Sequence, residues 1–125
     1  WPIYDLAAVN SSNTTINGGK IGSIYLWAKA VMTISNAEID VIDTLTTTGH
    51  LEIANGTTVN RINMNGNNAY KPDVTIKAGA TVKTLDLTKV TNITDIVIED
   101  GATVETIITA DGEMTLSAWK TANGK

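Results

Sequence analysis

The chain has 125 residues, a net charge of −4, 42% apolar residues and no cysteine. This length fits one domain, and the lack of cysteine excludes disulfides and thiolate metal sites while leaving the cellular compartment open. An acidic chain without a cluster of lysine or arginine does not fit a nucleic-acid surface. No apolar run approaches the length of about 18 residues that a spanning helix needs, so no membrane insertion is expected.

The first 13 residues lack the pattern that follows them. Pro2 and the polar run at residues 10–13 indicate a segment that precedes a repeat. The chain starts with Trp1 rather than Met, which suggests a processed chain or a piece of a longer one. We therefore predict residues 1–13 as an N-terminal cap or leading segment.

Residues 14–118 repeat one pattern of alternating apolar residues. The clearest copies, VTIKAGATVKTL and IVIEDGATVETI, start 22 residues apart at Val74 and Ile96. Such copies are typical of a β-solenoid, in which each coil stacks on the previous one. Following the register gives five coils and a sixth that begins at Met114 and Leu116, with coil lengths of 18–23 residues. We predict an all-β fold, a single-stack β-solenoid (parallel β-helix) of about five to six coils.

Alternation of side chains along each strand divides the repeat into inward and outward positions. Of 27 inward positions, 24 are apolar and three are threonine. They are Thr14, Ile16, Ile21, Ile24, Leu26, Met32, Ile34, Ile39, Ile42, Thr44, Leu51, Ile53, Val59, Ile62, Met64, Val74, Ile76, Val82, Leu85, Leu87, Ile96, Ile98, Val104, Ile107, Thr109, Met114 and Leu116.

A residue that tolerates positive φ recurs at one register of the repeat, three residues before a Val or Ile. Gly and Asn are the residues that adopt this backbone conformation most readily. Each coil is therefore expected to turn a tight corner between two strands at this position. The corner residues are Gly18, Asn36, Gly56, Gly79 and Gly101.

The last residues, 119–125, do not continue the repeat. An open solenoid end exposes an unpaired sheet edge and an unfilled core, so the end of a stack has to be covered. We predict a closing segment and tail here, with Trp119 packed against the last coil.

The coils differ on a third side, after the second strand. The longest insertion is NGNNAYKP, from Asn65 to Pro72, and the first coil carries Trp27 in the corresponding region. Such insertions on one side of a solenoid mark loops, which often form the binding face. An aromatic ring with amides is suited to a sugar or protein contact, although an Asn- and Gly-rich stretch is also what a plain long turn looks like. The candidate binding residues are Asn65, Asn67, Asn68, Tyr70 and Trp27.

Two acidic pairs, Asp40 with Asp43 and Glu99 with Asp100, raise the possibility of acid–base chemistry on a polysaccharide. Acids next to a glycine corner are also ordinary solvated turn residues. His50 is the one imidazole, and some solenoid acyltransferases use a histidine, but no partner motif accompanies it. The sequence contains no metal-ligand cluster and no phosphate-binding loop, so no cofactor is expected.

One outward register reads Lys20, Glu38, Thr58, Thr81 and Thr103. Ice binding requires a flat and regular array of threonines, and this one is short and interrupted. Threonine is also simply a residue suited to a β-surface.

The motif [IV]-x-x-G-A-T-V-x-T-[LI], present as IKAGATVKTL and IEDGATVETI, resembles β-helical segments of bacteriophage fibre, spike and decoration proteins and of bacterial surface adhesins. The resemblance implies a non-enzymatic structural or adhesive module at an extracellular or virion surface, attached to a glycan, a capsid or a partner subunit, and often trimeric. The alternative is a carbohydrate-active β-helix of the lyase or hydrolase type.

Overall fold

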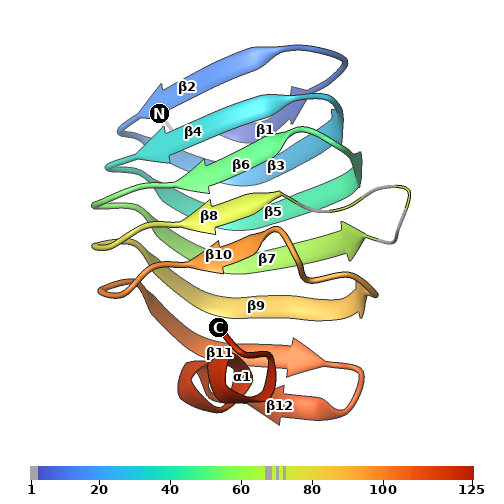
Figure 1. Cartoon of the computed structure of the whole chain (residues 1–125). Helices are drawn as coiled ribbons and strands as arrows, with labels where there is room; N and C mark the ends of the chain where they lie inside the picture. Colours follow the sequence, from blue (N-terminus) through green and yellow to red (C-terminus); the bar gives the residue numbers. More distant parts are fainter. Residues whose placement is uncertain (1–2, 67–68, 70, 72) are drawn as a thin grey trace.

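The computed structural model describes residues 3–66, 69, 71 and 73–125. It is 62% strand and 6% helix, and its parallel strands stack into a β-solenoid of about five turns (Figure 1). The all-β solenoid predicted from the repeat is confirmed.

Each full coil consists of a short strand, a tight corner, a long strand and a connection to the next coil (Figure 1). The strands form two sheets, which we call the long-strand sheet and the short-strand sheet. The long-strand sheet contains β1 (Ile3–Ala8), β3 (Lys20–Ala28), β5 (Glu38–Thr47), β7 (Thr58–Gly66), β9 (Thr81–Val90), β11 (Thr103–Thr109) and β12 (Gly112–Met114). The short-strand sheet contains β2 (Asn13–Asn17), β4 (Val31–Ser35), β6 (His50–Ile53), β8 (Val74–Ile76) and β10 (Ile96–Ile98).

The core consists of inward side chains that form columns from coil to coil. Ile34 pairs with Ile53, and Ile53 pairs with Ile76, so like residues lie above one another. Alternation along each strand sends every second side chain into this space. The predicted inward positions are all buried apart from five half-buried ones at the ends of the stack, which are Thr14, Ile16, Thr109, Met114 and Leu116.

The corner between the short and the long strand is made with positive φ in all five coils. In an L-residue this conformation brings the Cβ atom close to the following carbonyl oxygen, which is unfavourable. Glycine has no Cβ atom, and asparagine tolerates the conformation better than most residues. The φ angles are 93° at Gly18, 53° at Asn36, 81° at Gly56, 83° at Gly79 and 89° at Gly101.

The residue after each corner is small, and in three of the coils it is buried. Ala37, Thr57 and Ala80 occupy this position. Thr57 satisfies its buried hydroxyl group by donating a hydrogen bond to the carbonyl oxygen of Ile34 at 3.1 Å. A polar side chain is therefore accepted here without the cost of an unpaired donor.

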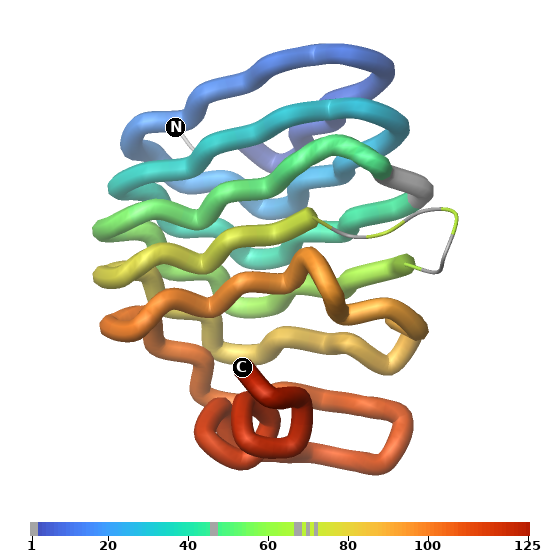
Figure 2. Tube along the Cα trace, viewed as in Figure 1, coloured from blue at the N-terminus to red at the C-terminus, as the bar shows by residue number. Residues whose placement is uncertain are grey.

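The connections that follow the long strands differ in length. Residues 29–30 connect β3 to β4, whereas residues 67–73 connect β7 to β8. Among the described residues, Figure 2 shows the corners on one side of the stack and connections such as residues 29–30 and 91–95 on the other. The variable segments thus lie together, as the repeat predicts.

Residues 3–8 of the predicted leading segment belong to the stack, although they lack the repeat pattern. Residues Ile3–Ala8 form β1, which runs parallel to β3 with Leu6 opposite Ile24. Gly22 permits the close approach of the two strands, because a Cβ atom there would lie 2.6 Å from the carbonyl oxygen of Tyr4. β1 therefore adds a long strand to the stack ahead of the first full coil.

The sixth coil predicted to begin at Met114 does not form. After β11 the chain reverses, and β12 pairs with β11 in antiparallel orientation. Helix α1 (Leu116–Ala122) follows, and the hydroxyl oxygen of Thr115 accepts a hydrogen bond from the amide of Ala118 at 3.1 Å. Trp119 lies in this helix, is 2% exposed and belongs to the core. The predicted boundary at residue 118 thus falls within a helix that lies at the C-terminal end of the stack (Figure 1).

Candidate functional site

Two of the five predicted binding residues lie on the long-strand sheet, and the other three lie outside the described residues. Trp27 is near the end of β3 and is 37% exposed, and Asn65 is near the end of β7. Only β5 separates these strands, so Trp27 and Asn65 are about 10 Å apart at the usual strand spacing. The predictions for Asn67, Asn68 and Tyr70 concern residues that the structure does not describe.

Trp27 forms an aromatic pair with Tyr25, two residues earlier on the same strand. Their ring centroids are 6.0 Å apart with an angle of 23° between the ring planes. Side chains at positions i and i+2 of a strand share a face, so the pair projects from the outer surface of the sheet. Of these two rings, only Trp27 is among the binding residues predicted from the sequence, although the same alternation also identifies Tyr25 as its neighbour.

A row of side chains crosses the sheet and starts at Tyr25 of the aromatic pair. Tyr25, Asp43, Asn63 and Asp86 occupy the same register in β3, β5, β7 and β9. Neighbouring strands are about 4.8 Å apart, so the row extends about 14 Å across the face of the sheet. It combines one aromatic ring, two carboxyl groups and one amide.

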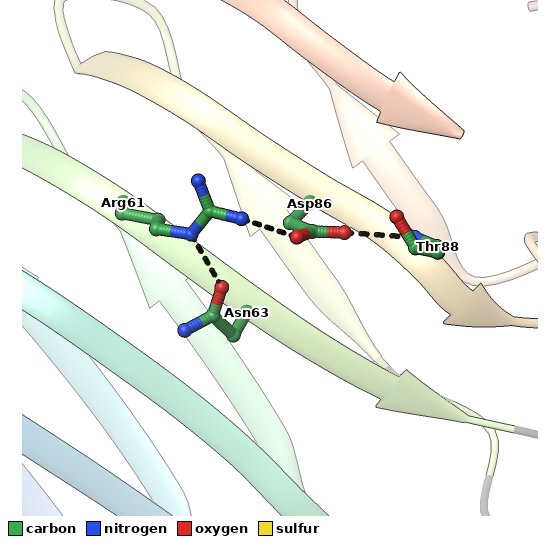
Figure 3. Close-up of polar contacts among 4 residues, drawn as sticks. All are labelled: Arg61, Asn63, Asp86 and Thr88. Atoms are coloured by element: carbon green, nitrogen blue, oxygen red, sulfur yellow. Dashed lines mark hydrogen bonds and ion pairs between the residues drawn. The ribbon is translucent and has the colours of Figure 1, made fainter. Parts of the chain in front are cut away.

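Arg61 connects two members of this row (Figure 3). Its Nε atom donates to Oδ1 of Asn63 at 2.6 Å, and its Nη2 atom donates to Oδ2 of Asp86 in an ion pair. Thr88 completes the network from the other side, since its amide donates to Oδ1 of Asp86 at 2.9 Å. The orientations of the Asn63 and Asp86 side chains are thereby held in place.

The environment of Asp86 keeps its carboxyl group ionised. Partial burial would by itself raise the pKa of Asp86, but the hydrogen bonds from Thr88 and the charge and hydrogen bond of Arg61 outweigh it. The net result is a pKa of Asp86 below its usual value. The side chain therefore acts at neutral pH as a hydrogen-bond acceptor.

A groove of about 550 Å³ lies over this part of the sheet. The amide and side-chain nitrogens of Asn65 donate to the hydroxyl and carbonyl oxygens of Thr44 at 3.2 and 3.1 Å, which ties Asn65 to the neighbouring strand. Rigid strands position such residues more accurately than loops do. The groove is lined by Asp43, Leu45, Asn63, Met64, Asn65, Asp86, Thr88 and Lys89.

In the two acidic pairs considered from the sequence, Asp40, Glu99 and Asp100 each contact a different residue outside the pair. Asp40 accepts a hydrogen bond from Nδ2 of Asn60 at 3.1 Å. Glu99 accepts one from the amide of Ala78 at 3.2 Å, and Asp100 is 3.6 Å from the Nζ atom of Lys120.

The remaining candidates also take part in contacts between coils. Nδ1 of His50 is 2.9 Å from Oδ1 of Asp73, near the junction of β6 and β8. The threonine register places Thr58, Thr81 and Thr103 in one row across β7, β9 and β11. In β3 and β5 the same row continues as an ion pair of 3.4 Å between the side chains of Lys20 and Glu38. The flat threonine array is thus limited to three strands.

Within residues 3–66, 69, 71 and 73–125, no group of three His, Cys, Asp or Glu side chains is placed to hold a metal ion. In the same residues, no helix combines the length and the apolar character needed to cross a lipid bilayer. Comparison of the chain with protein-family models, curated proteins and solved structures gives no match.

Proposed function

We propose that this chain is a non-enzymatic binding module whose solenoid presents the outer face of the long-strand sheet to a glycan. The observation that carries the proposal is the Tyr25–Trp27 pair on the same face of the sheet as the network of Arg61, Asn63 and Asp86, with β5 between the two groups. A sugar ring has an apolar face of C–H groups and a rim of hydroxyl groups. Aromatic rings suit the face, and fixed carboxylate, amide and guanidinium groups suit the rim.

The role of the solenoid in this proposal is structural. The groups that contact the glycan lie on paired strands with a packed core behind them, so little side-chain entropy would be lost on binding. The resemblance of the repeat to fibre and adhesin segments supports an attachment role at an extracellular or virion surface. The groove is open, so a short glycan is expected to bind with a dissociation constant on the order of 1 mM, equivalent to about 4 kcal/mol.

The test is a glycan array probed with the full chain, followed by titration of the best ligand in solution. Trp27→Ala is expected to weaken binding about fivefold or more, because stacking on an aromatic ring contributes about 1 kcal/mol or more. Trp27→Phe is expected to retain part of the affinity.

Val97→Ala is the matched control, since Val97 is an exposed apolar residue on the other sheet and should not affect binding. All variants should keep the melting temperature of the parent chain. Unchanged affinity of Trp27→Ala, or no glycan bound by the parent chain, would contradict the proposal.

A carbohydrate-active β-helix is the second candidate, because Asp43 and Asp86 stand in one row with Asn63 between them. Their strands are about 10 Å apart, close to the carboxyl separation of inverting glycosidases, which is about 6.5–9.5 Å. Such an enzyme also needs a carboxylic acid with a raised pKa, and Asp86 does not meet this requirement.

Release of reducing ends from a polysaccharide panel distinguishes the two candidates. The binding proposal predicts no turnover. Turnover that is lost in Asp43→Asn and in Asp86→Asn would replace it with the enzymatic function, and the same assay on Asp40→Asn and Glu99→Gln tests the acids selected from the sequence.

A further inference from the structure

The groove over β5, β7 and β9 lies where the regular pairing of the long strands is interrupted. Leu26 and Ala28 of β3 are two residues apart, but their partners in β5 are three residues apart. The same shift occurs between Asn63 and Asn65 of β7 and their partners in β9. Each shift is a β-bulge, which places one extra residue in one strand. β5 and β9 are therefore both bulged at the end that carries the groove.

The bulge in β9 brings two consecutive residues to the groove. Thr88 and Lys89 both line it, although neighbouring residues of a regular strand face opposite sides of a sheet. The amide of Thr88 donates to Oδ1 of Asp86 at 2.9 Å. The bulge thus adds a side chain to the groove without leaving that amide unpaired.

Two rows of outward side chains run across the strands at the groove. Tyr25 of β3 lies opposite Asp43 of β5, and Trp27 and Leu45 follow the next pair in the same two strands. The rows thus start at the aromatic pair and continue through the groove. The first row consists of Tyr25, Asp43, Asn63 and Asp86, and the second of Trp27, Leu45, Asn65 and Thr88.

The rows extend further across the strands than along them. In β7, Val59 and Ile62 are both buried although they are three residues apart, so the regular alternation stops between them. Beyond Ile62, only Asn63 and Asn65 are outward residues of β7 in the groove. Across β3, β5, β7 and β9 the rows extend about 14 Å. A long ligand therefore fits along the axis of the stack.

The spacing of the rows suits a polymer of sugar rings. Neighbouring strands are about 4.8 Å apart. A sugar ring in an extended linear chain advances by nearly the same distance, so successive rings come to lie over successive coils. Asp43, Asn63 and Asp86 then offer each ring an oxygen that accepts a hydrogen bond from a hydroxyl group.

The charged residues at the groove balance one another. Two acidic residues, Asp43 and Asp86, are matched by Lys89 in the groove and by Arg61, which pairs with Asp86. A chain of uronic acids would bring a negative charge to every coil without an excess of lysine or arginine to meet it. A chain of amino sugars would lack an excess of carboxylates in the same way. The groove therefore favours an uncharged chain.

We propose that the groove binds a linear, uncharged glycan that lies across the strands, with one sugar ring over each coil from β3 to β9. This inference rests on the glycan-binding function proposed above and adds the class, the direction and the length of the glycan. The first ring stacks on Trp27, and the fourth lies over Asp86 and Thr88 of β9.

Titration calorimetry of the full chain with oligosaccharides of one to six units tests the proposal. The uncharged series are linear oligomers of glucose, mannose, xylose and N-acetylglucosamine, and the charged series are oligomers of galacturonic acid and of glucosamine. At least one uncharged series is expected to bind about tenfold or more tighter than both charged series at equal length. Its affinity should rise from one unit to four and then level off, because the rows cover four strands.

Thr88→Ala tests the direction of the glycan. Thr88 lies at the β9 end of the rows, so its hydroxyl group should contact a chain of four units and not a chain of two that is held at Trp27. The variant is expected to weaken binding of four units about threefold or more and to leave binding of two units unchanged. Its backbone amide, which holds Asp86, is retained.

Thr103→Ala is the matched control, since Thr103 is an exposed threonine of β11 that does not line the groove. It should bind every oligomer like the parent chain, and both variants should keep the parent melting temperature. Equal binding of charged and uncharged series, no gain in affinity beyond one unit, or an equal effect of Thr88→Ala on two and four units would overturn this inference and leave the glycan-binding function in place. No binding of any series would count against both.

Discussion

Among single residues, glycines at the corners meet two constraints, a positive φ angle and, in some coils, close contact with the coil before. Gly79 has a φ of 83°, and a Cβ atom at this position would overlap Oδ1 of Asn55 in the coil before it. Gly19 also has a positive φ, 95°, but no atom lies within 4 Å of its Cβ direction. The two positions therefore separate the cost of the backbone conformation from the cost of the clash.

Gly79→Ala is expected to lower the free energy of unfolding by about 2–3 kcal/mol, of which about 1–2 kcal/mol comes from the left-handed backbone. Gly19→Ala, the control, should lose about 1 kcal/mol, because its new methyl group meets open space. Urea unfolding followed by circular dichroism measures both. Equal losses would show that contact between the corners of successive coils is unimportant.

Asp86 makes the stability of the protein depend on pH. Its pKa is lowered in the folded chain, so its contribution is fully present above the pKa of the unfolded chain, about 3.9, and is lost as the pH falls through the lower folded value. Asp86→Asn should therefore cost about 1 kcal/mol at pH 7 and less at pH 3. Urea unfolding at the two pH values measures this difference.

Asp100→Asn is the matched control, because the side chain of Asp100 is fully exposed and its ion pair with Lys120 is screened by water. It should leave the unfolding free energy nearly unchanged at both pH values. A loss at Asp86 that is the same at pH 7 and pH 3 would mean that its charge does not contribute to folding.

At the scale of elements, α1 takes the place that a further coil would occupy. The chain turns back after β11 at Gly112, where φ is 116°, and the hydroxyl group of Thr109 donates to the carbonyl oxygen of Gly112 at 3.1 Å. The short helix then depends on tertiary contact, since a helix of seven residues is not stable alone. Trp119 provides that contact.

Trp119→Ala is expected to reduce the free energy of unfolding by about 3 kcal/mol or more, because it leaves a cavity and opens the end of the core. Trp27→Ala removes the same side chain from an exposed position and should cost less than about 1 kcal/mol. Chemical denaturation of both variants measures the comparison. Similar losses would contradict the role of Trp119 in closing the stack.

At the scale of the whole molecule, the proposed glycan face extends over several coils. The face lies over β3, β5, β7 and β9, which belong to successive coils of the stack. The spacing of about 4.8 Å between neighbouring strands therefore sets the spacing of the groups on this face.

The sequence by itself determined the type of fold, the number of full coils, the inward positions and the corners. These follow from local chemistry, because strand alternation has a period of two and a tight corner needs a residue that accepts positive φ. The unequal lengths of the connections also show in the sequence, but Trp27 and Asn65, predicted on the variable side, lie in strands β3 and β7, and their role in binding stays a prediction.

Only the tertiary structure decided the features that depend on contacts between residues of different coils. Arg61 contacts Asp86, 25 positions later. The repeat register places Asn63 and Asp86 on neighbouring strands, but the direction that the long Arg61 side chain takes between them follows from side-chain packing and not from the register. The reversal after Thr109 and the pairing of β1 were missed because apolar alternation looks the same in a parallel coil, a hairpin and an edge strand. Which strand lies beside which is settled by packing of the whole stack, and that packing determines the candidate site.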